Sequence, residues 1–238
     1  MISTKEDYAC VIENQLYYGN SKLAGDEYRL KEIGVKSIVD LIKYYTKSKI
    51  IKHSSDFNVF HIDIEDIPTN GIDWCEEPAK FIDDQLSKNN AVYVHCSYGI
   101  SRSTALIIYY LITRKNQNLK QTFDQLKNIR NVASPNYGFM KGLSELEQKL
   151  YGTVTLSPVD YSLQCIYEIF PSVAKDEIDQ VYKGTKDEII NNKEKYDELV
   201  NAKNIEPVGY FTIQKLFDKY GNKAFVRRVN CNFHHPFE

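Results

Sequence analysis

The segment AVYVHCSYGISRS, residues 91–103, is the most informative part of this chain. It opens with a continuous β-prone run, Ala91–His95, of the kind that is buried on both faces in a parallel sheet. A short loop containing Gly99 follows, and the apolar residues of Arg102–Leu111 recur at helical spacing. The segment therefore predicts a strand, a loop and the start of a helix.

The sequence on either side of this segment continues the same alternation. Short β-prone runs are separated by stretches with apolar residues at helical spacing, and Gly and Pro mark the turns between them. This alternation predicts an α/β layer fold rather than a helical bundle or a sandwich. The expected strands are Leu16–Gly19, Ser37–Leu41 and Asn58–Ile64, and the expected helices are Glu27–Ile33 and Asp73–Leu86.

The character of the chain changes after residue 152. Ser157-Pro158 marks a break, so we expect a first domain at residues 7–152 and a mainly helical accessory region at residues 158–238. Its role is open: it packs on the first domain or recruits a protein partner. The expected helices are Tyr161–Phe170, Asp176–Tyr182, Lys186–Val200 and Phe211–Tyr220, and Ala224–Val229 is a short β run.

The composition is that of a globular protein in water. Of 238 residues, 42% are hydrophobic and 26% charged, and the formal net charge is -2 with a sequence pI of about 6.2. No global field attracts nucleic acid or an acidic membrane. The longest apolar run, residues 105–112, is too short for membrane insertion, and the first residues lack a secretory signal. We expect a cytoplasmic protein, with the nucleus as the alternative.

The five cysteines and five histidines lack the spacing of a metal site. An odd number of cysteines without a C-x-x-C pair fits reduced thiols. Cys75 could form a protective disulfide with Cys96, but we expect a buried helix cysteine instead. The adjacent His234-His235 point to different faces and are interpreted as surface residues. The cysteines are Cys10, Cys75, Cys96, Cys165 and Cys231.

The loop after the Ala91–His95 strand has the residues needed to attack a phosphoester. A loop that leads into a helix can turn successive N–H groups inward, and with the helix dipole these groups bind a phosphate and stabilise a thiolate. Cys96 is therefore the predicted nucleophile. Arg102 can hold two phosphoryl oxygens with its planar guanidinium group, which lysine cannot do.

Three neighbouring residues have predicted supporting roles. Gly99 suits a sharp turn and a close approach to the phosphate. The Ser103 hydroxyl is placed to donate to the Cys96 sulfur and ease its departure in the second step. His95 is expected to brace the loop by hydrogen bonding.

The leaving oxygen needs a proton, so an acid should lie on a loop near the site. Asp63, Glu65 and Asp66 are the candidates. Asp63 alternates within a predicted strand and is expected on a solvated face. Asp66 starts the loop that contains Pro68, and we choose it as the general acid.

Residues 95–103, with Gly99 and Ser101 inside the loop, resemble the signature loop of the dual-specificity protein phosphatases, a branch of the cysteine-based protein tyrosine phosphatase superfamily. Leu16–Gly19 resembles the opening strand of that family. Residues 133–139, ASPNYGF, resemble its Pro-Asn-x-Gly-Phe element. The likeness covers about Asp7–Tyr151.

The resemblance implies a central, mostly parallel sheet flanked by helices and a two-step hydrolysis through a phosphocysteine, with no metal and no cofactor. It matches Asp66 to the general acid and Asn136 to an asparagine that supports the phosphate loop. The implied phosphate-binding residues are Ser97, Tyr98, Gly99, Ile100, Ser101 and Arg102.

The loop also bears on the substrate. It contains no lysine, whereas relatives that act on phosphoinositides commonly have basic residues there, so phosphorylated Tyr, Ser or Thr in proteins is the expected substrate. Tyr98 occupies a position that is often Ala or Glu in the family. Its side chain either changes the rim of the phosphate pocket or simply packs against its neighbours. The catalytic segment begins near the N-terminus, so no upstream kinase-docking domain and no dedicated role toward mitogen-activated kinases are expected. The alternatives are a phosphatase of lipid, RNA or carbohydrate phosphates and a catalytically inactive phosphate-binding adaptor.

Overall fold

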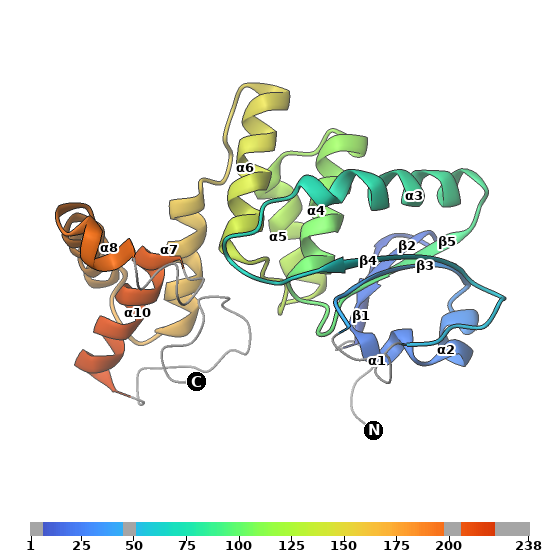
Figure 1. Cartoon of the computed structure of the whole chain (residues 1–238), viewed down its shortest axis with the longest axis horizontal. Helices are drawn as coiled ribbons and strands as arrows, with labels where there is room; N and C mark the ends of the chain where they lie inside the picture. The colour runs from blue at the N-terminus through green and yellow to red at the C-terminus, as the bar shows by residue number, and fades with distance from the viewer. Residues whose placement is uncertain (1–6, 45–50, 198–205, 222–238) are drawn as a thin grey trace.

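A five-stranded sheet forms the centre of the molecule (Figure 1). The computed structural model describes residues 7–44, 51–197 and 206–221. The strand order is β1-β2-β5-β3-β4, in which β1 is antiparallel to β2 and the other pairs are parallel. The predicted mostly parallel sheet is thus confirmed. The strands are β1 (Tyr8–Ile12), β2 (Leu16–Gly19), β3 (Val35–Ile42), β4 (Asn58–Ile64) and β5 (Ala91–His95).

Strand β5 lies in the middle of the sheet and is buried on both faces, as its sequence predicts. Its residues Val92 and Val94 belong to the larger hydrophobic cluster, whereas Ala91 and Tyr93 belong to the smaller cluster on the opposite side. This division follows from the two-residue period of a strand. Because β5 is central, the residue that follows it, Cys96, emerges in the middle of the sheet's carboxyl edge.

Helices cover both faces of the sheet (Figure 1). Two short helices, α1 and α2, lie on the face of the smaller cluster, and the longer helices cover the other face. The predicted helix at Asp73–Leu86 begins as a 3₁₀ turn, η3 (Asp73–Cys75), which continues into α3. The helices are α1 (Ser21–Ala24), α2 (Glu27–Glu32), α3 (Glu76–Ser87), α4 (Arg102–Lys115), α5 (Leu119–Ile129) and α6 (Tyr137–Tyr151).

The accessory region is helical in its described part, as expected. Helices α7 (Pro158–Ile169), α8 (Lys175–Asn191) and α10 (Pro207–Tyr220) lie to one side of the sheet, beside α6 (Figure 1). Their apolar side chains continue the larger hydrophobic cluster of the first domain; they include Ile166, Ile169, Ile178, Ile213 and Leu216. The region is therefore packed on the first domain through a shared core.

The helix boundaries correct one prediction. The two helices expected at Asp176–Tyr182 and Lys186–Val200 are a single helix from residue 175 to residue 191, followed by a further helical stretch at 193–197. Gly184 does not interrupt α8, because a single exposed glycine costs a helix only about 1 kcal/mol relative to alanine. The helix expected at Phe211–Tyr220 starts earlier, at Pro207, and ends before Gly221, which has a φ of +64°.

Some elements have no counterpart in the sequence predictions. Strand β1 and helices α1, α5 and α6 are in this group, although Leu119, Phe123 and Leu126 give α5 a helical period and Asn118 caps it. The predicted β run at 224–229, Cys231 and the histidines at 234–235 lie outside the described residues.

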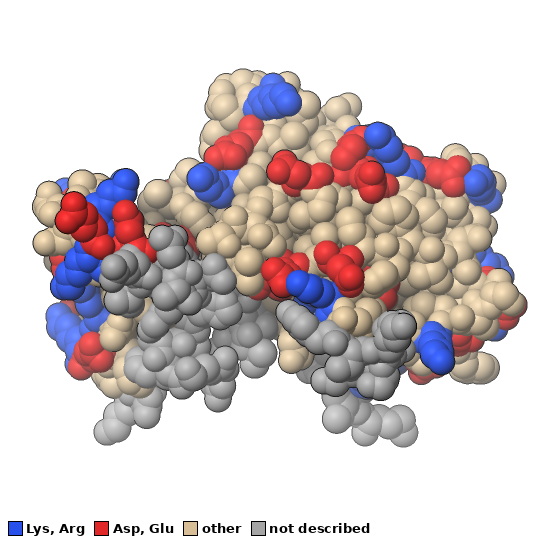
Figure 2. All heavy atoms as spheres, in the orientation of Figure 1, with Lys and Arg blue, Asp and Glu red and all other residues tan. Residues whose placement is uncertain are grey.

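The charges on the surface are mixed. On the face in Figure 2, acidic and basic side chains are interspersed, and acidic ones gather over α3. Within residues 7–44, 51–197 and 206–221, no helix is both long and apolar enough to cross a membrane.

Candidate active site

The predicted nucleophile sits directly after the central strand. The Cys96 side chain is 1% exposed, and its Sγ lies 3.4 Å from the Ser103 Oγ in the first turn of α4. Strand and helix thus bring a thiol and a hydroxyl seven residues apart into hydrogen-bond distance. This is the geometry that a serine needs to stabilise a departing thiolate.

Residues 96–102 are here called the phosphate loop. Four of its carbonyl groups, those of residues 97–100, accept hydrogen bonds from residues outside the loop. The Ser97 carbonyl accepts hydrogen bonds from the backbone N–H (3.1 Å) and side chain (2.9 Å) of Ser21. Arg130 donates to the carbonyls of residues 98 (3.1 Å) and 99 (3.0 Å), and the Ser134 N–H donates to that of residue 100 (2.9 Å).

The direction of these carbonyls fixes the direction of the N–H groups. In a trans peptide unit the C=O of one residue and the N–H of the next point in opposite directions. With the carbonyls of residues 97–100 bonded outward, the N–H groups of residues 98–101 are turned toward the inside of the loop. Inward N–H groups at a helix N-terminus form a site for an anion such as phosphate.

Gly99 is required by its neighbour in the fold. Its φ is +70°, which favours glycine, and a Cβ there would lie 2.3 Å from the Gly19 carbonyl carbon. The predicted sharp turn is present. A close approach is made to the backbone of Gly19 at the end of β2. The approach of Gly99 to the phosphate stays a prediction.

Arg102 is anchored by one nitrogen. Its Nη1 donates to the carbonyls of Leu41 and Ile64, each at 3.2 Å, near the ends of β3 and β4. Its Nη2 donates to Ser97 Oγ at 3.2 Å, and its Nε lies 3.4 Å from Asp66 Oδ2. The edge with Nε and Nη2 faces the loop, and this is the edge that binds two oxygens of a phosphoryl group.

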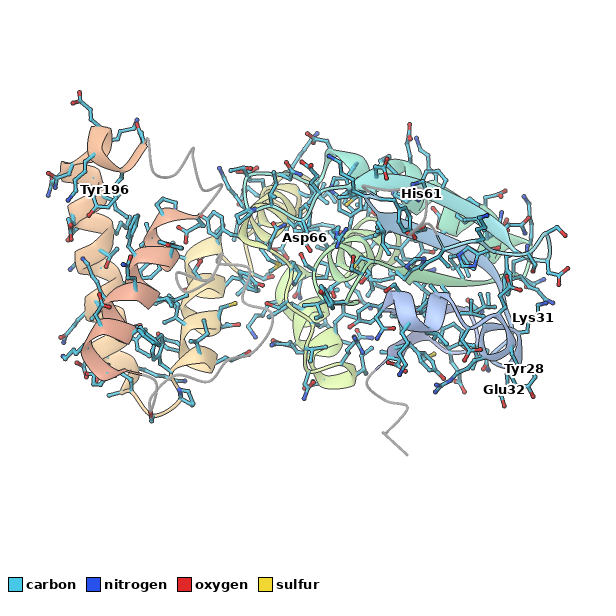
Figure 3. The ribbon with its side chains drawn as sticks, turned by 60° about the horizontal axis from the view of Figure 1, so that its bottom comes forward. Tyr28, Lys31, Glu32, His61, Asp66 and Tyr196 are labelled. Carbon is cyan, nitrogen blue, oxygen red and sulfur yellow. The ribbon has the colours of Figure 1, made fainter. Side chains whose placement is uncertain are left out.

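Of the three acid candidates, only Asp66 reaches the loop. Its Oδ1 accepts hydrogen bonds from Ser101 Oγ (2.6 Å) and Asn136 Nδ2 (2.9 Å). Asp63 is 58% exposed and pairs with His61, and Glu65 pairs with Lys43. Figure 3 shows Asp66 at the end of the sheet that is nearer the C-terminal helices. Both donors hold Oδ1, whereas Oδ2 lies toward Arg102 Nε, at 3.4 Å.

Residues 130–136, here called the support segment, connect α5 to α6. They donate several hydrogen bonds to the phosphate loop. The Asn136 side chain caps α6 by accepting from the Phe139 N–H, and its backbone N–H donates to Ser101 Oγ at 3.0 Å. Its placement agrees with the role that the resemblance implies. Arg130 was missed by sequence reasoning, because an arginine directly after a helix has no motif around it.

His95 lies at the end of β5, directly before the nucleophile. Its ring is fully buried, and Nε2 lies 3.6 Å from Asp40 Oδ1. The ring stacks on Tyr93 at 5.9 Å. Burial lowers the pKa of His95 to about 4, against the opposing charge of Asp40. A hydrogen bond with the backbone of Cys96 also opposes this lowering. The bracing of the loop by His95 stays a prediction.

The other residues that the sequence analysis singled out differ in their exposure to solvent. Tyr98 is 68% exposed at the rim of the loop, whereas Ile100 is buried. Cys75 is fully buried in η3, and burial raises the pKa of its thiol well above the usual range. The prediction of a buried helix-associated cysteine is confirmed.

Comparison with protein families identifies the family of this chain. The profile of the family described as "Dual specificity phosphatase, catalytic domain" matches residues 16–149. The chain therefore belongs to the dual specificity phosphatase family, a class of cysteine-based phosphatases that need no metal.

The individual relatives are phosphatases with low sequence identity to this chain. "Protein-tyrosine-phosphatase MKP1" of Arabidopsis thaliana is 28% identical over 177 residues, 74% of this chain and 22% of that protein. "Dual specificity protein phosphatase 1" of Arabidopsis thaliana is 33% identical over 143 residues, 59% of this chain and 69% of that protein. The chain thus spans between about a fifth and about two thirds of these relatives. Any 177-residue stretch of this chain includes α7, so the first match extends beyond residues 16–149.

Solved structures share the fold. The human tyrosine phosphatase-like serine/threonine/tyrosine-interacting protein superposes with a TM-score of 0.56 at 27% identity, covering 62% of this chain and 99% of that one. A mouse putative dual specificity phosphatase, solved in complex with zinc tungstate, superposes with a TM-score of 0.57 at 24% identity, covering 64% and 92%. The second likeness supports the fold alone.

Proposed function

We propose that this chain is a protein phosphatase that hydrolyses phosphotyrosine and phosphoserine or phosphothreonine through a phosphocysteine on Cys96. The observation that carries the proposal is the set of outward-bonded carbonyls at residues 97–100, which turns N–H groups inward around the Cys96 sulfur. Membership of the dual specificity phosphatase family also supports protein phosphatase activity.

In the first step, the Cys96 thiolate attacks phosphorus and the bond to the substrate oxygen breaks. Arg102 and the N–H groups of residues 98–101 hold the three equatorial oxygens, over which charge spreads in the transition state. Asp66 gives its proton to the leaving oxygen, from the oxygen atom that Ser101 and Asn136 do not hold.

In the second step, water attacks the phosphocysteine and Asp66 takes up the proton that water loses. The phosphorus–sulfur bond breaks and the thiolate leaves. The Ser103 hydroxyl, 3.4 Å from Sγ, donates to the sulfur as its negative charge returns. Inorganic phosphate and the free thiolate are the products, so the atoms and charges balance.

The test is hydrolysis of p-nitrophenyl phosphate in the presence of a chelator, followed by matched phosphotyrosine and phosphothreonine peptides. Cys96→Ser should lower kcat at least about ten-thousandfold, because it removes the nucleophile. Cys165→Ser is the matched control, since Cys165 is also buried but lies in α7. Activity that survives in Cys96→Ser would contradict the proposal.

The acid is tested in the same assay. Asp66→Asn should lower kcat on the phosphotyrosine peptide about a hundredfold or more. Asp63→Asn, an exposed acid three residues earlier, should leave kcat unchanged. If purified and reduced wild-type protein binds tungstate yet hydrolyses nothing, the adaptor alternative replaces the enzyme. If it hydrolyses lipid, RNA or sugar phosphates far better than peptides, the non-protein alternative does.

A further inference from the structure

Helix α7 lies outside the residues that the family profile matches, yet one of its side chains contacts the support segment. Tyr161 is 2% exposed, and its ring packs edge-on against Phe123 of α5 with the centroids 5.4 Å apart. Its hydroxyl donates a hydrogen bond to the Pro135 carbonyl and lies 3.2 Å from Ser134 Oγ. The accessory region therefore reaches the backbone that holds the phosphate loop.

This contact lies between two hydrogen bonds that shape the site. Before Pro135, the Ser134 N–H donates a hydrogen bond to the carbonyl of residue 100. After Pro135, the side-chain amide of Asn136 donates a hydrogen bond to Asp66. The Pro135 carbonyl shares its peptide unit with the Asn136 N–H, which donates to Ser101 Oγ, so Tyr161 and Ser101 together fix the orientation of this unit. A change in the orientation of that carbonyl would displace both neighbours.

We propose that Tyr161 is a positioning residue for the reaction. Its hydroxyl holds Ser134-Pro135 in the orientation that directs the Ser134 N–H to the phosphate loop and the Asn136 amide to Asp66. Its effect on catalysis rests on the proposed function, whereas its effect on oxyanion binding does not. The accessory region thereby contributes to the active site through the support segment.

A purely structural role for Tyr161 has different consequences. A buried tyrosine that only stabilises the fold would change the fraction of folded protein, which lowers the rate on every substrate by the same factor. A displaced Asp66 slows poor leaving groups more than good ones, because a good leaving group needs less protonation. A displaced phosphate loop weakens the binding of an oxyanion even without chemistry.

The experiment compares Tyr161→Phe with wild type in the full chain. Phenylalanine keeps the ring and its packing on Phe123 and removes only the hydroxyl. Tyr151→Phe is the matched control, because the Tyr151 hydroxyl also donates to a backbone carbonyl, that of Ile112 at 2.6 Å in α4. The measurements are kcat on a phosphotyrosine peptide and on p-nitrophenyl phosphate, together with the affinity for tungstate.

The proposal predicts that Tyr161→Phe lowers kcat on the peptide about tenfold and on p-nitrophenyl phosphate about threefold or less. Tungstate affinity should fall about threefold, and Tyr151→Phe should match wild type in all three. Either an unequal loss on the two substrates or weaker tungstate binding supports the proposal. Equal losses with unchanged tungstate affinity, or no change at all, overturn it.

The outcome is separable from that of the proposed function. If wild type hydrolyses neither substrate, the proposed function fails, and the tungstate comparison still decides the role of Tyr161. Weaker binding in Tyr161→Phe would support positioning of the loop, and equal binding would overturn it.

Discussion

The phosphate loop and helix α7 both bear on the geometry around Cys96, but the sequence encodes them in different ways. The loop places its nucleophile, its anion-binding backbone and Arg102 within seven consecutive residues between β5 and α4. Helix α7 contributes one hydroxyl, that of Tyr161, 65 positions after the nucleophile in the sequence. Groups that touch the substrate form a recognisable motif here, whereas a group that acts through another residue does not.

The largest expected effect comes from the loop itself. Gly99→Ala places a Cβ against the Gly19 backbone and forces alanine to a φ of +70°, so the loop must shift. We expect kcat/KM to fall at least about a hundredfold, measured on p-nitrophenyl phosphate. Gly152→Ala is the control, because that glycine has a φ of +71° but open space around it. Equal rates in the two variants would mean that the contact with Gly19 does not shape the loop.

The support segment should give the next largest effect. Arg130→Ala removes the donors to the carbonyls of residues 98 and 99, so their peptide units are free to turn. We expect kcat/KM to fall about thirtyfold, with weaker tungstate binding. Arg114→Ala, which breaks ion pairs with Glu76 and Asp83 away from the loop, should leave both values unchanged. An unchanged tungstate affinity in Arg130→Ala would contradict the inference that Arg130 orients the peptide units of the phosphate loop.

The same residues explain what the sequence predicts well and what it does not. The β5–loop–α4 unit and the choice of Asp66 depend on neighbouring residues, so local patterns suffice. Arg130 contacts a residue 31 positions away and Tyr161 one 26 positions away, and no local pattern links either of them to the loop. The Gly99 conformation was predictable but its contact with Gly19 was not, because the contact depends on how β2 packs beside β5.

A third prediction concerns the stability of the accessory region. Glu206 caps α10 and is 5% exposed; burial raises its pKa to about 7, against the hydrogen bonds from the backbone N–H groups of Gly209 and Val208. Because the folded pKa lies above the unfolded value, the folded state holds the proton more tightly. The stability that this provides is fully present below about pH 4.5 and is lost as the pH rises through about 7.

Glu206→Gln should remove this dependence. Between about pH 5 and about pH 8, the unfolding free energy of wild type should fall by about 2 kcal/mol relative to that of the variant. Denaturant unfolding at a series of pH values measures the difference. The accessory region, but not the loop, would then be the pH-sensitive part. Parallel pH profiles for the two proteins would rule out a buried, titrating Glu206.

The smallest effect is expected at the surface between the two regions. Lys127 of α5 and Glu168 of α7 form an ion pair at 2.9 Å, and both side chains are partly exposed. Glu168→Gln should cost less than about 1 kcal/mol of unfolding free energy and leave kcat unchanged. Lys127 is kept, because its Nζ also donates to the Asn131 carbonyl in the support segment. A clear loss of kcat would mean that α7 acts on the site through its overall docking rather than through the Tyr161 hydroxyl.

The most direct test of the account is detection of the covalent intermediate. Ser103→Ala removes the donor that stabilises the departing sulfur, so breakdown should become slower than formation and phosphate should accumulate on the enzyme. The measurement is rapid acid quench after mixing with p-nitrophenyl phosphate, followed by mass spectrometry of the peptide that contains Cys96. The account predicts a phosphorylated Cys96 in this variant and none in Cys96→Ser. Turnover of substrate without phosphate on Cys96, or with phosphate on another residue, would contradict it.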